Sequence, residues 1–294
     1  GDINIKSSGA GLIGGIIGYA TRVNEDDGVF ENCVNNGNIN LIAQAASNIG
    51  GIVGQIRHYE LLECENNGAI TIGEGYKSSV ELYIGGIAGY TNGRNSAANG
   101  EVFITECTNN GEIKIDKNAI PMLGGIVGYT TQPVIIEGCT NKANVSAHLT
   151  NTNAFHIGGL VGDNYGKISN CYNTATVTGS YAGGIAGYSS STISNCYFLD
   201  NMEKGVGSGT NNTTKCTIEQ LTQRSTYIGF DFENDWVWDE SLQSYPCLRG
   251  LHYHTYDNSC DKTCNTCGST RSITHTYTNN CDDICNVCGI TRTP

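Results

Sequence analysis

One short pattern occurs six times in this chain and limits what the chain can fold into. It consists of two glycines, two apolar residues and a third glycine, as in the stretch GGIAG at 183–187. The steps between successive copies are 36, 35, 39, 34 and 25 residues. The copies begin at Gly14, Gly50, Gly85, Gly124, Gly158 and Gly183. A period of 20–50 residues indicates a solenoid, a propeller or another repeat array.

Every repeat also contains one cysteine, followed by asparagine or another small polar residue. The six cysteines are Cys33, Cys64, Cys107, Cys139, Cys171 and Cys196. The second glycine and the cysteine lie between 12 and 21 residues apart, so the longer units contain insertions. A solenoid tolerates insertions because they bulge outward from the stacked frame.

Within each unit, apolar and polar residues alternate over short stretches, as in EIKI at 112–115 and ATVT at 175–178. Such period-two runs, bounded by Gly, Asn and Ser, are typical of β-strands. We expect three strands per unit: the Gly-Gly stretch, the stretch entering the cysteine and the stretch after Asn-Asn-Gly. A 25-residue unit cannot bury its own apolar side and must stack on its neighbours at about 4.8 Å per rung. The sequence therefore predicts an all-β protein, a right-handed, three-sided parallel β-helix of about six rungs over residues 1–200.

Two other repeat architectures fit this spacing less well. A four-stranded propeller blade needs about 40–50 residues, whereas the last step supplies 25. A calcium-binding β-roll repeats its glycine motif every nine residues or so, and here the motif recurs far more rarely.

The composition limits the class of partner. The chain carries 16 Lys and Arg against 28 Asp and Glu, a formal net charge of −12. Long-range attraction to nucleic acid or to an anionic membrane surface is therefore not expected. The apolar runs are short and broken by glycine, so no transmembrane helix and no membrane insertion are predicted.

The glycine pattern followed by Cys-x-Asn resembles the GLUG-motif repeats of bacterial surface proteins. Those repeats occur in adhesins and beside the catalytic parts of immunoglobulin A-cleaving metallopeptidases. The resemblance covers about residues 1–200 and implies a scaffold. None of the six histidines lies in the His-Glu-x-x-His motif of the peptidases, so no catalytic residue is predicted.

Residues 201–251 differ from the repeats and are interpreted as a cap on the open end of the solenoid, which would otherwise expose unpaired backbone groups. Thr217 and Gln220 have the spacing of a capping box and predict a short helix. Two further cysteines, Cys216 and Cys247, fall in this region, and a disulfide between them is possible.

The tail, residues 252–294, contains two copies of a 21-residue module with one histidine and three cysteines. Three thiolates and one imidazole form a complete ligand set for a structural zinc. Pairing each histidine with the cysteines that follow it fills two sites, although His275 could serve either module. The ligands are His254, Cys260, Cys264 and Cys267 in the first module and His275, Cys281, Cys285 and Cys288 in the second. Similar modules recur in extracellular proteins of gut-type Gram-positive bacteria, and this resemblance agrees with an exported chain.

Disulfides are the alternative to zinc in the tail. An oxidising environment favours them, and three cysteines per module would then require a bridge between the modules. Unpaired thiols are a third possibility. The sequence leaves these alternatives open.

Three other patterns have structural explanations. One cysteine at the same place in each rung predicts a ladder of small buried side chains. The tyrosine after the glycine pattern (Tyr19, Tyr90, Tyr129, Tyr188) predicts either corner packing or an exposed aromatic stripe for sugars. The acidic residues are interpreted as solvated loop charges, and they include Asp26, Asp27, Asp231, Glu233, Asp235, Asp239 and Glu240.

The sequence thus favours a non-enzymatic adhesion or stalk module, at the cell surface or secreted. We expect a monomer whose partner is a host or matrix glycan or protein. Binding is expected in the inserted loops, because loops on a rigid frame carry function. These loops span about 21–29, 73–81, 91–101 and 147–156. The alternatives are a polysaccharide-acting β-helix enzyme and an accessory domain of a surface metallopeptidase.

Overall fold

The computed structural model describes residues 1–5, 11–21, 28–41, 48–73, 81–93, 102–115, 120–148, 155–238, 245–251, 258–262, 273, 275–277 and 284–291. The chain divides into two compact units, Gly1–Phe230 and Asp231–Pro294. The first unit, hereafter the coil, therefore includes residues 201–230 of the predicted cap. The second unit is called the tail unit.

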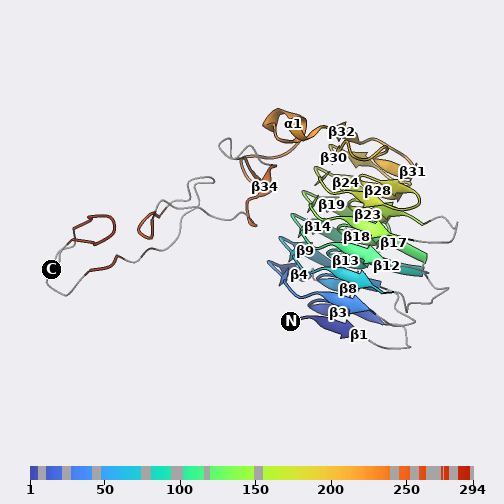
Figure 1. Ribbon diagram of the computed structural model, residues 1–294, viewed down its shortest axis with the longest axis horizontal. Helices are drawn as coiled ribbons and strands as arrows, with labels where there is room; N and C mark the ends of the chain where they lie inside the picture. Colours follow the sequence, from blue (N-terminus) through green and yellow to red (C-terminus); the bar gives the residue numbers. More distant parts are fainter. Residues whose placement is uncertain are drawn as a thin grey trace. The chain divides into compact units, whose positions relative to one another are not determined.

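The coil is a parallel β-helix, as predicted, with strands stacked in sequence order along its axis (Figure 1). Each turn of the chain contributes one strand to each of five sheets, named A to E in the order in which the chain visits them.

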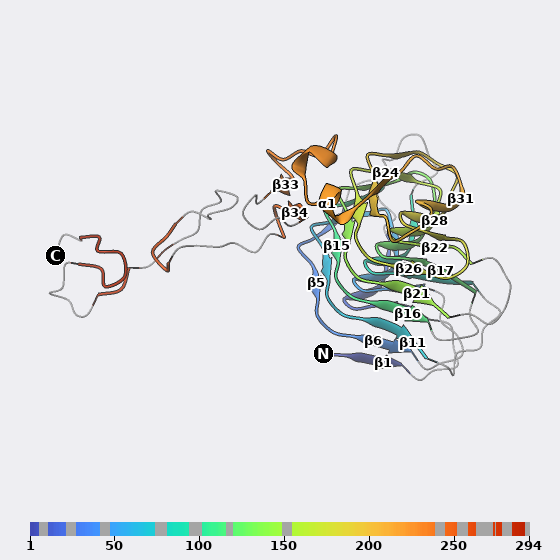
Figure 2. The same cartoon turned by 45° about the horizontal axis from the view of Figure 1, so that its top comes forward.

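Insertions of different length separate sheets A and B, and two more, 22–27 and 93–101, separate sheets C and D. Figure 2 shows the strands of sheet A side by side. Sheet A consists of β1 (Ile3–Ile5), β6 (Ile39–Leu41), β11 (Ile70–Ile72), β16 (Ile113–Ile115), β21 (Val145–Ala147) and β26 (Val177–Thr178). Sheet B, which ends on the first glycine of each pair, consists of β2 (Leu12–Gly14), β7 (Asn48–Gly50), β12 (Glu81–Gly85), β17 (Ile120–Gly124), β22 (Ile157–Gly158) and β27 (Ala182–Gly183).

Sheets C, D and E complete each turn. Sheet C consists of β3 (Ile17–Thr21), β8 (Val53–Arg57), β13 (Ala88–Asn92), β18 (Val127–Thr130), β23 (Val161–Asn164), β28 (Ala186–Ser189) and β31 (Val206–Gly209). Sheet D consists of β4 (Gly28–Glu31), β9 (Tyr59–Leu62), β14 (Val102–Thr105), β19 (Val134–Glu137), β24 (Lys167–Ser169) and β29 (Ile193–Ser194). Sheet E consists of β5 (Val34–Asn35), β10 (Glu65–Asn66), β15 (Thr108–Asn109), β20 (Thr140–Asn141), β25 (Tyr172–Asn173), β30 (Tyr197–Leu199) and β32 (Thr214–Cys216).

The structure has five strands per turn where the sequence predicted three. The glycine pair bends the chain, so the Gly-Gly stretch forms two strands, one in sheet B and one in sheet C. A second bend precedes each cysteine, and a strand of mostly two residues in sheet E follows it. The residue at this bend is left-handed in all six turns, with φ between 48° and 62°: Asn32, Glu63, Glu106, Gly138, Asn170 and Asn195. Asn and Gly tolerate this conformation best.

The glycine pairs stay in register through the whole coil, whatever the length of the insertions between them. In sheet B, the first glycine of each pair lies opposite that of the next turn, from Gly14 to Gly183. The insertions leave from the strand ends and do not interrupt the ladders. Inside, columns of Ile, Val and Leu are buried, and each fully buried side chain of this size contributes about 1.5–3 kcal/mol.

The two sequence landmarks of each repeat meet in space. A Cβ added to Gly86, a second glycine of its pair, would lie 2.3 Å from Cγ of Asn109 and 2.1 Å from the carbonyl oxygen of Gly125. Asn109 follows Cys107 by two residues, and the equivalent asparagine packs on the second glycine in four other turns. Glycine is therefore required here because the asparagine amide and a backbone carbonyl occupy the space of a side chain.

The segment after the sixth turn closes this end of the coil. Strands β31 and β32 add a partial seventh turn to sheets C and E. Helix α1 (Ile218–Leu221) follows, and its capping box is formed: the Thr217 amide donates to Gln220 Oε1 (2.9 Å), and the Gln220 amide donates to Thr217 Oγ1 (3.2 Å). A short 3₁₀ helix, Arg224–Thr226, leads to the aromatic cluster of Tyr197, Tyr227 and Phe230.

The tail unit has few regular elements among its described residues. Strands β33 (Trp236–Val237) and β34 (Cys247–Leu248) pair antiparallel. Asp231 accepts hydrogen bonds from the amides of Glu233 (2.8 Å) and Asn234 (2.9 Å), so this acidic residue shapes a turn. Of the helices in the described part of the chain, none has the length and apolar character needed to span a membrane.

Candidate functional site

A ladder of asparagines runs through the interior of the coil along sheet E. In the first four turns the Nδ2 group donates to Oδ1 of the next asparagine at 2.8 Å, linking Asn35, Asn66, Asn109, Asn141 and Asn173. Each amide also bonds the backbone two residues further on, as Asn66 does with the Gly68 carbonyl (2.9 Å). Such a network satisfies the buried polar groups and holds neighbouring turns together. In the sixth turn Phe198 takes the asparagine position and ends the ladder.

The six repeat cysteines form a second ladder beside the asparagine ladder, and their thiols are unreactive. Five of the six repeat thiols are fully buried, and Cys33 in the first turn is half-buried; all six are free. Each thiol donates to carbonyls, as Cys139 does to Ile104 and Glu137 (both 3.3 Å). Burial raises the pKa of the Cys107, Cys139 and Cys171 thiols well above its usual range. Thiols of this kind are inert structural groups.

The tyrosines after the glycine pattern form only part of a larger set of rings. Tyr90 and Tyr129 stack with centroids 5.5 Å apart, but Gln55 stands opposite both Tyr19 and Tyr90 in the register. Asp163 takes the tyrosine position in the fifth turn. Rings from elsewhere join the row, and the resulting surface, called the aromatic face, consists of Tyr83, Tyr90, Tyr129, Tyr165, Tyr188 and His156.

Two carboxylates lie within the aromatic face. The Tyr83 hydroxyl donates to Glu81, and the pKa of Tyr83 is raised by burial and by this carboxylate. Asp163 is buried and contacts the imidazole of His156. The face therefore presents half-buried rings, hydroxyl groups and the exposed carboxylate of Glu81, which suits a ligand with both apolar and hydrogen-bonding surfaces.

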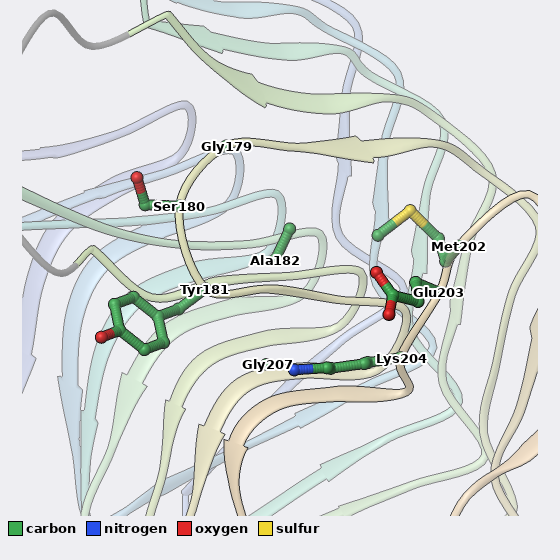
Figure 3. Close-up of a pocket in the computed structure, with 8 residues that line it drawn as sticks. All are labelled: Gly179, Ser180, Tyr181, Ala182, Met202, Glu203, Lys204 and Gly207. Atoms are coloured by element: carbon green, nitrogen blue, oxygen red, sulfur yellow. The ribbon is translucent and has the colours of Figure 1, made fainter. Parts of the chain in front are cut away.

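A hollow of about 380 Å³ lies beside one end of the aromatic face. Figure 3 shows Tyr181 on one side of it and Glu203 and Lys204 on the other. Tyr181 is 49% exposed, has a left-handed φ of 44° and meets the His156 ring edge-on at 5.8 Å. Tyr181 therefore connects the hollow with the aromatic face.

Four residues of the tail form a cluster with the composition of a metal centre. The ligand atoms of Cys260, His275, Cys285 and Cys288 all lie within 4.8 Å of one another. Cys260 Sγ is 3.5 Å from Cys285 Sγ, and Cys288 Sγ is 3.3 Å from His275 Nδ1. Cys260 and Cys285 are buried, and the other two are partly exposed. This group could hold one metal ion.

The turn after Cys285 places backbone amides near its sulfur and favours the thiolate form that binds a metal. The Gly289 amide donates to the Cys285 carbonyl (2.9 Å), and Gly289 has a φ of 72°, which glycine adopts readily. The amides of Cys288 and Val287 bond the Cys285 sulfur and lower its pKa to about 5. Burial and the neighbouring Cys285 raise the pKa of Cys260 to about 11. Cys285 is thus a thiolate near neutral pH, as a metal ligand must be.

Several predicted positions fall outside the described residues. These are His254, Cys264, Cys267 and Cys281 of the tail, the acids Asp26, Asp27, Asp239 and Glu240, and most of the four predicted binding loops. Cys216 and Cys247 are described, and each is a free thiol. Cys216 donates to the Thr214 carbonyl (3.9 Å) and Cys247 to that of Tyr245 (3.7 Å). The two residues belong to different units, so the possible disulfide between them stays a prediction.

Two features of these sites were missed from the sequence. An asparagine lies two residues after each of five cysteines, and this constant spacing could have predicted the asparagine ladder. Tyr83 and His156 each lie two residues before the first glycine of a pair, as Tyr181 does, and this shared phase was a sign that was overlooked. Tyr165 has no such place relative to the glycine pattern and meets the tyrosine row from the bend after β23.

Comparison with protein families identifies the repeat. The family model of the GLUG motif matches residues 153–178. The described part of this span is one complete turn of the coil, from β22 through β23, β24 and β25 to β26. The chain therefore carries the GLUG motif, in agreement with the resemblance drawn from the sequence, and the motif corresponds to one turn. Neither a curated protein nor a solved structure matches the chain.

Proposed function

We propose that this chain is a non-enzymatic adhesion or stalk module of an extracellular protein, at the cell surface or secreted. The observation that carries the proposal is the uninterrupted register of the coil. All six glycine pairs and the asparagine ladder stay aligned while insertions of different length leave the frame. Such a frame supports loops without depending on their sequence, which suits an adhesin.

The partner proposed is a host or matrix glycan or protein, bound by a monomer. The inserted loops are the first candidates for contact. The aromatic face and the hollow beside it are a second, described surface with rings, hydroxyls and carboxylates. The net charge of −12 disfavours nucleic acid and anionic membranes as partners.

Binding is tested with the purified chain on arrays of glycans and matrix proteins. The expected result is a bound ligand whose signal falls at least about tenfold when Tyr165 and Tyr181 are both replaced by alanine, because burying an aromatic ring contributes a few kcal/mol. Tyr59→Ala, on sheet D, is the matched control and should bind as the wild type does. A reducing-sugar assay accompanies the array. Turnover of any glycan would contradict the non-enzymatic proposal and favour the β-helix enzyme.

We also propose that the tail cluster binds zinc as a structural ion. Three sulfurs and one imidazole are a common structural zinc set, with Zn–S near 2.3 Å and Zn–N near 2.0–2.1 Å. A tetrahedron with these bonds has S–S edges of about 3.8 Å and S–N edges of about 3.5 Å. The observed separations of 3.5 Å (Cys260–Cys285) and 3.3 Å (Cys288–His275) need to open by only a few tenths of an ångström. A disulfide would instead need about 2.05 Å between the sulfurs.

Metal analysis of the purified chain tests this second proposal, together with a count of reactive thiols before and after a chelator. Zinc in the protein and new reactive thiols after chelation are expected. A chain without metal whose tail thiols react only after reduction would show disulfides and contradict the proposal.

A further inference from the structure

The four residues of the metal cluster come from both tail modules. His275, Cys285 and Cys288 belong to the second module, while Cys260 is the first cysteine of the first module. The sequence assigned Cys260 to a site with His254 and gave the second module Cys281. The placement of Cys260 in the cluster is therefore not explained by two independent modules.

We propose that a single metal ion joins the two tail modules, with Cys260 of the first module as the fourth ligand of the site in the second. This inference rests on the proposed binding of zinc to the cluster. A tetrahedral structural site has four places, and Cys260, His275, Cys285 and Cys288 fill them. Cys281 is then not a ligand of this ion.

The separations within the cluster agree with this assignment. The pairs Cys260–Cys285 (3.5 Å) and Cys288–His275 (3.3 Å) share no atom, so they form two opposite edges of one tetrahedron. All other pairs lie within 4.8 Å. The first-module thiol thus occupies a corner of the tetrahedron, a few tenths of an ångström closer to Cys285 than two sulfur ligands of one zinc ion lie.

Local hydrogen bonds hold the three contributing segments. Next to the first ligand, Asn258 accepts from the Cys260 amide through Oδ1 (2.8 Å) and from the Asp261 amide through its carbonyl (3.1 Å). On the other side, the Asn286 amide donates to the Thr276 carbonyl (2.9 Å), which ties the segment of His275 to the turn after Cys285. Cys260 and the pair Cys285 and Cys288 therefore stand on hydrogen-bonded turns, and the segment of His275 is tied to the second of these turns.

The position of Cys260 also explains why a thiol from the first module is buried. Cys260 is 7% and Cys285 2% exposed, in tail modules with few apolar side chains to cover them. A metal that bridges residues 25 positions apart closes a large loop, and small domains with little core use such cross-links to fold. The tail is then one metal-bridged unit instead of two separate knuckles.

The test uses the full chain in a Cys264→Ser, Cys267→Ser background, in which a separate first-module site cannot form. This background is expected to keep one zinc per chain. Adding Cys260→Ser should weaken zinc binding more than about 100-fold, since even the loss of a residue that only supports a ligand costs 10–100-fold. Adding Cys281→Ser, the matched control, should leave zinc binding unchanged. The charge-transfer absorption of bound Co²⁺ reports the number of thiolate ligands. It should fall with Cys260→Ser and stay unchanged with Cys281→Ser.

The outcomes separate the two proposals. Wild type and background without zinc would refute metal binding itself. Zinc in the background that survives Cys260→Ser and is lost with Cys281→Ser would refute the shared site alone and restore the assignment within one module. Loss of zinc in both variants would also overturn the inference, because it requires Cys281 to be dispensable.

Discussion

The coil and the tail both contain cysteine at regular intervals, yet the surroundings give the thiols opposite properties. In the coil, Cys139 is buried among apolar columns and donates to two carbonyls, and its pKa is raised. In the tail, two backbone amides bond the sulfur of Cys285 and lower its pKa to about 5. The first environment stabilises the neutral thiol and the second the thiolate. The comparison teaches that the periodicity of a cysteine says little about its role until the groups that face the sulfur are known.

The largest effect on the coil is expected from a side chain added at the second glycine of a pair. Gly86→Ala places a Cβ 2.1 Å from the Gly125 carbonyl oxygen and 2.3 Å from Asn109. Both neighbours are held in ladders, so we expect a loss of about 4 kcal/mol or more of unfolding free energy. Gly73→Ala is the matched control, because its Cβ would meet only Leu41 at 3.8 Å. Urea denaturation measures the free energy of unfolding of both variants. Equal values would contradict the close packing of Gly86 against Asn109 and the Gly125 carbonyl.

A smaller effect is expected from breaking the asparagine ladder. Asn109→Ala removes hydrogen bonds to Asn66 and Asn141 (both 2.8 Å) and leaves buried partners unpaired. At about 1–3 kcal/mol for each unpaired group, we expect a loss of about 3 kcal/mol. Asn35→Ala, at the first turn, removes one ladder bond and should lose about half as much. A ladder that contributes nothing would give the same denaturation midpoint as the wild type.

The thiols of the coil should contribute less again. Cys139→Ala removes one small buried group and leaves a minor cavity, so we expect a loss of about 1–2 kcal/mol with no change in the tail. Cys33→Ala should lose less, since Cys33 is half-buried. Thermal denaturation compares them. A larger effect at Cys33 than at Cys139 would show that burial does not set the contribution.

The smallest effect is a pH dependence confined to the metal-free tail. The folded-state pKa of Cys285, about 5, lies below the value of about 8.5 for a free cysteine. Its contribution to folding is therefore fully present above that free value and is lost as the pH falls through about 5. At pH 6.5, iodoacetamide should alkylate Cys285 faster than Cys260, whose pKa is raised to about 11. Equal rates would show that the amides do not stabilise the Cys285 thiolate.

The sequence predicted the parts of the fold that depend on period. The spacing of the glycine pairs gave the stacked turns, and Thr217 with Gln220 gave the helix after them, because both follow from local patterns. The five sheets were not predicted, since the bend before each cysteine rests on a left-handed residue that is Asn in some turns and Glu in others.

The tail shows a different limit. Its ligand types were evident from the composition of the modules, but the sequence gives no distance between modules. Because the two modules are equivalent copies, the spacing of the residues fits two assignments of the metal ligands equally well. In one, all four ligands of a site come from one module; in the other, both modules contribute. The fold of the tail brings the sulfur of Cys260 to 3.5 Å from that of Cys285.

The central claim, that the coil thiols are buried by packing while a metal ion shields the tail thiols, is tested most directly by alkylating the native chain with and without a chelator and locating the labels by mass spectrometry. Chelation is expected to expose Cys260, Cys285 and Cys288 to labelling while the buried thiols from Cys64 to Cys196 stay unlabelled. Labelling of the coil thiols on chelation, or tail thiols that react equally with and without the chelator, would contradict it.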